Sequence, residues 1–183
     1  WDVILKKQID LIGHKNFYLS GTMIGVGPKE GQIIFDAGRS FDTFNEKKFL
    51  DNYKKYNISD FQGSTWAPHV VHKEIWNSVG GFSLEFWPGA ASDPDLNMKL
   101  WKKGIRIFKG INDFKVYHFG SIVTRKYKNN KKIVTDSGSR GGKIFLLKWG
   151  ISIKFFKKFF LKSGTKYTKE LNEPNKNLNY IIS

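Results

Sequence analysis

Two aspartates flank a proline in the stretch Ser92-Asp93-Pro94-Asp95-Leu96, and a histidine, His118, follows further along the chain. A carboxylate can take a proton from an attacking hydroxyl, and an imidazole can bind a divalent cation. Both residue types also have structural uses, since an aspartate caps a helix and a histidine at the end of a strand is commonly hydrogen-bonded within a fold. These residues can do chemistry together only if the chain brings them to one cleft.

The elements around these residues are predicted from local pattern. Pro94 suits the first turn of a helix, with Asp93 before it as the cap and Asp95 near the positive end of the helix dipole. The helix pattern ends at Gly104. Two strand patterns then follow, over residues 106–108 and 114–118. The order therefore predicts an acid at the start of a helix and a histidine at the end of a strand.

Four motifs in this order carry a family resemblance: VGGF at 79–82, SDPDL at 92–96, the helix ending at Gly104, and VYHF at 116–119. Together they resemble the C-terminal half of the family-2 glycosyltransferases of the GT-A fold. In that family the first half binds the nucleotide-sugar and ends in an acidic DxD motif, and the second half supplies the acceptor site. The resemblance implies an α/β chain, a partial GT-A fold with a mixed sheet flanked by helices and a helical C-terminal extension. In the family a Trp-Asp pair and a helix follow the DxD motif, so Trp1-Asp2 implies that the nucleotide-binding half is missing here.

The resemblance also implies roles for individual residues. Asp93 would be the general base of an inverting transfer to a hydroxyl, Asp95 its acidic neighbour and His118 a metal ligand. The family often has Glu-Asp where this chain has Ser92-Asp93, so the choice between Asp93 and Asp95 as the base stays open. A divalent cation, Mn²⁺ or Mg²⁺, would neutralise the departing diphosphate, and it is expected only with the missing donor half. Asp93-Pro94-Asp95 also has the spacing of DxD itself, but its place at the start of a helix before His118 favours the second half.

Further candidates would bind the substrates, a nucleotide-sugar donor and a glycan or lipid-linked acceptor. Trp66 and Trp87 can stack on a sugar face, or they can pack in the core as tryptophans commonly do. The resemblance places Gly81 beside the sugar and acceptor. Arg140 and Lys143 would supply charge to the diphosphate from a flexible loop, or they belong to a solvated basic loop. The Ser-Arg-Gly-Gly-Lys run there lacks the spacing of a P-loop.

Other elements and segment boundaries follow from the same patterns. We expect the acceptor-side part of the catalytic domain over residues 1–123, a mobile basic loop over 124–142, a basic amphipathic helical segment over 143–170 and a tail over 171–183. Within the first part, helices are predicted at 1–12, 46–56 and 73–78, and strands at 17–24, 32–35 and 70–71. In the third part, two helices are predicted on either side of Gly150. His69 and His72 flank a strand and are not assigned as a metal pair.

The segment 151–162 puts phenylalanines on one helical face and lysines on the other. Such a helix lies on an anionic membrane surface, or it packs its phenylalanines on the core and leaves its lysines in water, and the pattern does not decide between them. No apolar run approaches the length of a membrane span. We therefore predict a cytoplasmic protein, peripheral on the inner membrane face if the first alternative holds.

Composition bounds the remaining possibilities. The chain has 183 residues, 40% apolar and 16% aromatic, which suits one ordinary globular domain. It has no cysteine, which excludes disulfides and thiolate metal sites. The net charge of +15 suits a transferase that holds a diphosphate. A nucleic-acid-binding module is not expected, because no such motif is present and the aromatic residues fall at core spacings. A carbohydrate-binding module without catalysis stays an alternative, as does a basic domain that binds a membrane surface or, less favoured for the reason just given, nucleic acid.

Overall fold

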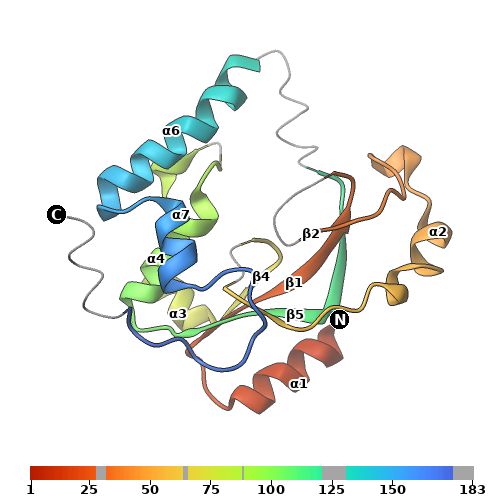
Figure 1. The fold of residues 1–183 in the computed structure, drawn as a ribbon, viewed down its shortest axis with the longest axis horizontal. Helices are drawn as coiled ribbons and strands as arrows, with labels where there is room; N and C mark the ends of the chain where they lie inside the picture. The colour runs from red at the N-terminus through yellow and green to blue at the C-terminus, as the bar shows by residue number, and fades with distance from the viewer. Residues whose placement is uncertain (28–31, 64–65, 88, 121–130, 175–183) are drawn as a thin grey trace.

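The computed structural model describes residues 1–27, 32–63, 66–87, 89–120 and 131–174. It is an α/β structure in which helices flank a mixed, curled sheet (Figure 1). The strand order is β2-β1-β5-β3, and β4 also pairs with β1. The mixed sheet with flanking helices confirms the coarse fold prediction.

Strand β1 (Phe17–Gly25) is the centre of the sheet, and all nine of its residues are buried. It runs parallel to β2 (Gln32–Ile34) and β5 (Ile107–His118) and antiparallel to β4 (His69–Val71). The short strand β3 (Phe61–Gln62) pairs antiparallel with β5. A strand covered on both faces is mostly apolar, and in 17–25 the polar exceptions Ser20 and Thr22 are themselves buried.

The two faces of β1 belong to different cores. Phe17 and Leu19 pack with Leu5 of helix α1 (Asp2–Ile12) on one face. Tyr18 points to the opposite face, into the larger cluster that includes Leu96 and other residues of the helices shown on the left of Figure 1. Because successive side chains of a strand alternate, Tyr18 lies beneath α3 (Lys73–Ser78) and α4 (Ser92–Lys102) rather than beneath α1.

The structure has one strand, β5, where the sequence predicted two. The pairing with β1 shifts register between Ile111 and Lys115, so the intervening residues form an irregularity inside a continuous strand. The loop before β3 satisfies Asn112 there: its backbone N–H donates to Asp60 Oδ1 at 2.9 Å, and its side-chain amide donates to Asn57 Oδ1 at 2.7 Å. Polar residues that looked like a break therefore have long-range partners.

One predicted helix and one predicted loop need correction. The helix predicted over 46–56 is α2 (Glu46–Leu50) followed by a separate 3-10 turn, η2 (Tyr53–Lys55); another such turn, η1, covers Phe41–Thr43. Of the predicted mobile loop 124–142, residues 124–130 lie outside the described residues, and from Lys131 the chain belongs to helix α6 (Lys131–Trp149). Gly141 explains part of the difference, because a Cβ there would lie 2.4 Å from the carbonyl oxygen of Ala90. The glycine permits a close helix contact instead of breaking the helix.

The C-terminal helices divide at Gly150, as predicted. Helix α7 (Ile153–Phe155) continues into the π-helical turn η5 (Phe156–Phe160). Phe156 is fully buried, and Phe160 packs partly buried against the same core. This side of the segment faces the protein and not a lipid phase. The segment after η5 is also attached to the fold, since the buried Leu171 donates its N–H to the carbonyl oxygen of Arg106. Among the described residues, no helix is long and apolar enough to cross a membrane.

Candidate functional site

Asp93 lies at the beginning of α4, but it is not the cap that the sequence predicted. The N-cap is Ala91, with φ 71°, and α4 starts at Ser92 without a side-chain cap bond. Asp93 instead turns toward β4, where its Oδ1 lies 3.3 Å from Nε2 of His69. The Asp93 side chain is 40% exposed, so it can be reached from solvent. Because the Asp93 carboxylate does not cap the helix and is partly exposed, it is available to a ligand.

His69 connects Asp93 to the interior of the fold. The backbone of His69, in β4, pairs with that of Ser20 in β1. Its ring is 16% exposed, and Nδ1 lies 2.5 Å from the hydroxyl of the fully buried Tyr18. Burial, followed by the charge of Asp93, raises the pKa of Tyr18 well above its usual value. Asp93, His69 and Tyr18 thus form a row of polar side chains that runs from the surface inward, with Tyr18 hydrogen-bonded to His69 and Nε2 of His69 close to Asp93.

Asp95 has the opposite environment. It is fully buried, and its two oxygens accept from Ser83 Oγ at 2.6 Å, Trp149 Nε1 at 2.9 Å and Lys148 Nζ at 2.9 Å. These partners come from α6 and from the segment that enters η3 (Leu84–Phe86). Asp95 therefore joins three elements and offers no exposed oxygen to a substrate. A catalytic role for Asp95 does not fit this geometry, which leaves Asp93 as the candidate base.

His118 ends β5, far from Asp93 along the sheet. It pairs with Gly25, five positions after the Ser20 that pairs with His69. At about 3.4 Å per residue this is a separation of roughly 17 Å along β1. Within the described ranges, no group of three or more His, Cys, Asp or Glu side chains is placed to hold a metal ion. Asp93 and His118 do not form a cation site together in the described part of the chain, and the role of His118 as a metal ligand stays a prediction.

Two of the proposed sugar-binding residues are buried. Trp66 is 8% exposed and stacks on Phe61 with ring centroids 5.3 Å apart, so this ring face is covered. Gly81 is buried with φ 56°, and a Cβ there would lie 2.7 Å from the ring of Trp76. Its carbonyl oxygen accepts from Lys99 Nζ at 2.5 Å. Both residues have packing roles, and their assignment to acceptor binding stays a prediction.

The remaining candidates gather beside the N-terminus of α4. Trp87 is 69% exposed, and its carbonyl oxygen accepts from Arg140 Nη1 at 3.4 Å. Arg140 and Lys143 are exposed on α6 and not on a loop. The neighbouring Gly141 contacts Ala90 and Ala91, which come just before the start of α4. Trp87 and Arg140 therefore lie near the segment that leads into α4, and Lys143 is exposed further along α6.

The sequence did not predict the roles of His69 and Tyr18. His69 was weighed only as a metal partner of His72, and that histidine instead accepts at Nδ1 from the N–H of Glu74 as the cap of α3. Tyr18 lies in a strand that was predicted only as a core element, and nothing in its local sequence indicates a partner for its hydroxyl. No protein-family model matches the chain, and comparisons with curated proteins and with solved structures gave no match either. The family resemblance therefore depends on the motifs alone.

Proposed function

We propose that this chain is the acceptor-side part of an inverting glycosyltransferase with a partial GT-A fold, and that Asp93 is its general base. The observation that carries the proposal is the contrast between the two aspartates of one motif. Asp93 is partly exposed at a helix N-terminus with His69 behind it, while Asp95 is sealed in the structure. A base must be within reach of the proton that it takes, and only Asp93 meets that condition.

The chemistry assigns each neighbour a task. Asp93 takes the proton of an acceptor hydroxyl while the hydroxyl oxygen bonds to the anomeric carbon of a nucleotide-sugar. The bond from that carbon to the diphosphate breaks on the opposite side, which inverts the configuration. Trp87 offers an exposed ring for a sugar face, and Arg140 and Lys143 offer positive charge for the diphosphate. The acceptor would be a glycan or a lipid-linked sugar.

Replacement of Asp93 tests the proposal. Release of nucleotide from a panel of nucleotide-sugars would be measured for this chain alone and for the chain joined to the nucleotide-binding half of a family-2 glycosyltransferase. We expect turnover only when the nucleotide-binding half is joined to this chain, and we expect Asp93→Asn to lower it by about 10²- to 10⁴-fold because the base is lost. The matched control is Asp10→Asn, an exposed acid of α1 that pairs with Lys6. Full activity of the Asp93→Asn protein would contradict the proposal.

A carbohydrate-binding module without catalysis is the second candidate, and the exposed ring of Trp87 is the observation that favours it. Such a module needs an aromatic platform but not Asp93. Loss of glycan binding in Trp87→Ala, with unchanged binding in Asp93→Asn and no turnover of any donor, would support this candidate over the transferase.

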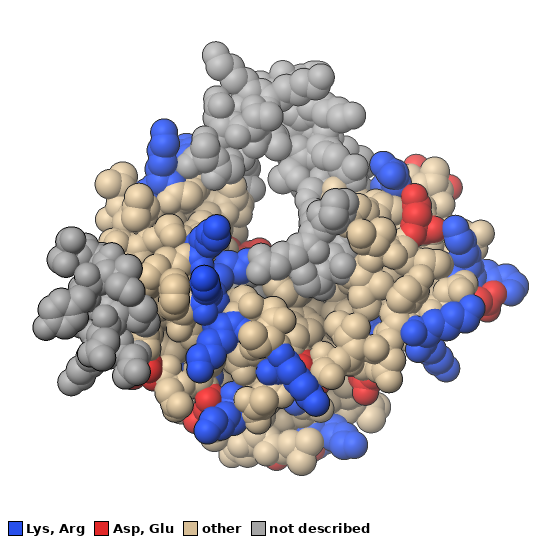
Figure 2. Space-filling model, viewed as in Figure 1, with Lys and Arg blue, Asp and Glu red and all other residues tan. Residues whose placement is uncertain are grey.

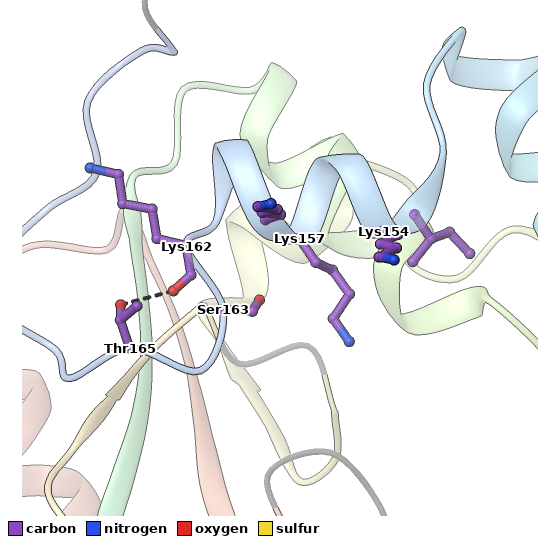
Figure 3. A pocket seen from close by; sticks show the side chains of 7 residues that line it. Lys154, Lys157, Lys162, Ser163 and Thr165 are labelled. Carbon is purple, nitrogen blue, oxygen red and sulfur yellow. Dashed lines mark hydrogen bonds between the residues drawn. The ribbon is translucent and has the colours of Figure 1, made fainter.

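We also propose that the chain contacts an anionic membrane surface through α7 and η5, which would place it on the cytoplasmic side near a lipid-linked acceptor. A hollow of about 660 Å³ lies beside α7 and η5. It is lined by four lysines and three uncharged residues: Lys154, Lys157, Lys158, Lys162, Ile153, Ser163 and Thr165. Figure 3 shows Lys154 and Lys157 on the helix and Lys162 and Thr165 beyond its end. No acid lines this hollow, and in the described part of the chain no ion pair neutralises Lys154, Lys158 or Lys162. We call these four lysines the lysine groove.

A further inference from the structure

The row of side chains formed by Asp93, His69 and Tyr18 leads from the surface into the interior, which the proposed function does not require. Exposure falls step by step, from 40% for the side chain of Asp93 to 16% for that of His69 and none for Tyr18. We propose that His69 is a positioning residue for Asp93, and that Tyr18 fixes the ring in the form that donates from Nε2 to the carboxylate. The inference rests on the proposed function, because it explains how that function's base is held.

Tyr18 acts as the donor in its contact with His69. Its raised pKa means that the phenol keeps its proton across the physiological range. Two acceptors lie within reach of the hydroxyl: Nδ1 of His69 at 2.5 Å and the carbonyl oxygen of Trp66 at 3.4 Å. The shorter contact takes the proton of the hydroxyl, since hydrogen bonds weaken toward 3.5 Å.

This contact determines the tautomer of His69. A neutral imidazole has one N–H and one accepting nitrogen, so an Nδ1 that accepts from Tyr18 leaves the proton on Nε2. Nε2 is the atom that faces Asp93 Oδ1 at 3.3 Å. Tyr18 and Phe82 each lie 5.6 Å from the imidazole between ring centroids, and the pairing of His69 with Ser20 holds its backbone. The ring is therefore placed by β1, β4 and the VGGF turn together.

Positioning has a chemical consequence for Asp93. When one carboxylate oxygen accepts from His69, rotation of the carboxylate is restricted, and the second oxygen remains for the acceptor hydroxyl. Misplacement of a reacting group by about 1 Å can cost roughly 10²-fold in rate. His69 touches neither the substrate nor the reacting atoms in this arrangement, so its effect is transmitted through Asp93.

Nitrogen NMR of the histidine rings in the full chain tests the tautomer without any substrate. We expect His69 to carry its proton on Nε2, and we expect Tyr18→Phe to shift the ring toward the Nδ1–H form because the donor to Nδ1 is gone. The other three histidines serve as internal controls, and His69→Gln identifies the signal. A proton on Nδ1 in the unmodified chain, or a tautomer that is indifferent to Tyr18→Phe, would overturn the inference.

Substitution of His69 tests whether this residue positions Asp93. The rates are measured in the protein that carries the nucleotide-binding half, in which sugar transfer is expected. Glutamine can donate from its amide nitrogen to Asp93 and accept from Tyr18 at its oxygen, whereas leucine can do neither. We expect His69→Leu to lower kcat by about 10²-fold with little change in KM, and His69→Gln to restore most of the loss. Equal rates for the two variants, at equal unfolding midpoints, would refute the positioning role. If His69 has the expected tautomer but the protein transfers no sugar, the contacts among Tyr18, His69 and Asp93 are supported, and only the proposed function is contradicted.

Discussion

A carboxylate as deeply buried as that of Asp95 needs hydrogen-bond donors or a positive charge to compensate for the loss of water, and Asp95 has both. Its oxygens accept from a hydroxyl, an indole N–H and an ammonium group, contributed by Ser83, Trp149 and Lys148. Burial of an isolated charge is very costly, so the pairing compensates for desolvation more than it adds stability. The removal of Asp95 would leave the indole N–H of Trp149 without its acceptor, whereas Lys148 would keep Glu85.

We predict that Asp95→Asn destabilises the fold by about 3 kcal/mol, at the low end for a broken buried pair because the Lys148 side chain is 28% exposed. Asp93→Asn, at a partly exposed position, should change stability by only about 0.5 kcal/mol. Urea unfolding of the two variants measures both free energies. A smaller loss for Asp95→Asn than for Asp93→Asn would show that the two residues have been assigned the wrong way round.

At the scale of elements, α4, η3 and α6 are joined by one lysine. Lys148 Nζ lies 2.6 Å from Glu85 Oε1 as well as 2.9 Å from Asp95. The hydrogen bond from Lys148 lowers the pKa of Glu85. Burial lowers the pKa of Lys148, but hydrogen bonds to Glu85 and Asp95 outweigh that effect and raise it.

The directions of these pKa shifts determine how stability should vary with pH. Because the pKa of Glu85 is depressed in the folded state, its stabilisation is present above the ordinary carboxyl pKa and is lost as pH falls through the lowered value. The raised pKa of Lys148 acts oppositely, so its contribution is full below the ordinary lysine pKa and is lost only as pH rises through the raised value.

We predict that Glu85→Gln costs about 0.2–1 kcal/mol at neutral pH, a small effect because Glu85 is 45% exposed, and that this difference from the unmodified chain disappears in acid. Urea unfolding over a series of pH values measures it. The control is Glu46→Gln, an exposed acid of α2 with no ion pair in the described ranges. A Glu85→Gln difference that persists or grows as the carboxyl group is protonated would contradict the assignment.

Local signals in the sequence predicted the elements that depend on neighbours along the chain. Gly13 ends α1 in the left-handed region, the bounds of α3 agree with the prediction, and Gly150 separates α6 from α7. The start of α6 was missed because the polar, lysine-rich stretch before residue 140 resembles a loop in sequence. Within α6, Gly141 contacts Ala90, which belongs to a distant element. The candidate site shows the same difference between local and long-range information. The local motif predicted Asp93, but its partner His69 is brought close to it by the pairing of β4 with β1, which the sequence does not reveal.

At the scale of the whole molecule, the excess positive charge is unevenly compensated. Lysines on other elements have acidic partners, as in the pairs Lys6–Asp10, Lys47–Asp51 and Lys109–Asp60. The lysine groove has no acid in its lining, and Figure 2 shows blue side chains gathered over α7 and the segment that follows it. Like charges spaced three and four residues apart on a helix repel one another, so an anionic surface would relieve this repulsion.

We predict that the chain binds vesicles rich in phosphatidylglycerol and does not bind vesicles of phosphatidylcholine alone. Because each lysine near an anionic surface contributes about 1 kcal/mol, Lys154→Gln with Lys158→Gln should weaken partitioning by roughly 2 kcal/mol, or about 30-fold. The matched control is Lys54→Gln with Lys55→Gln, which removes the same charge from η2, near α2 and across the molecule from α7 in Figure 1. Sedimentation with vesicles at low and high salt gives the partition constants, and binding should fall with salt as the charges are screened. Equal weakening by both pairs would mean that net charge alone, and not the lysine groove, attracts the protein to the surface.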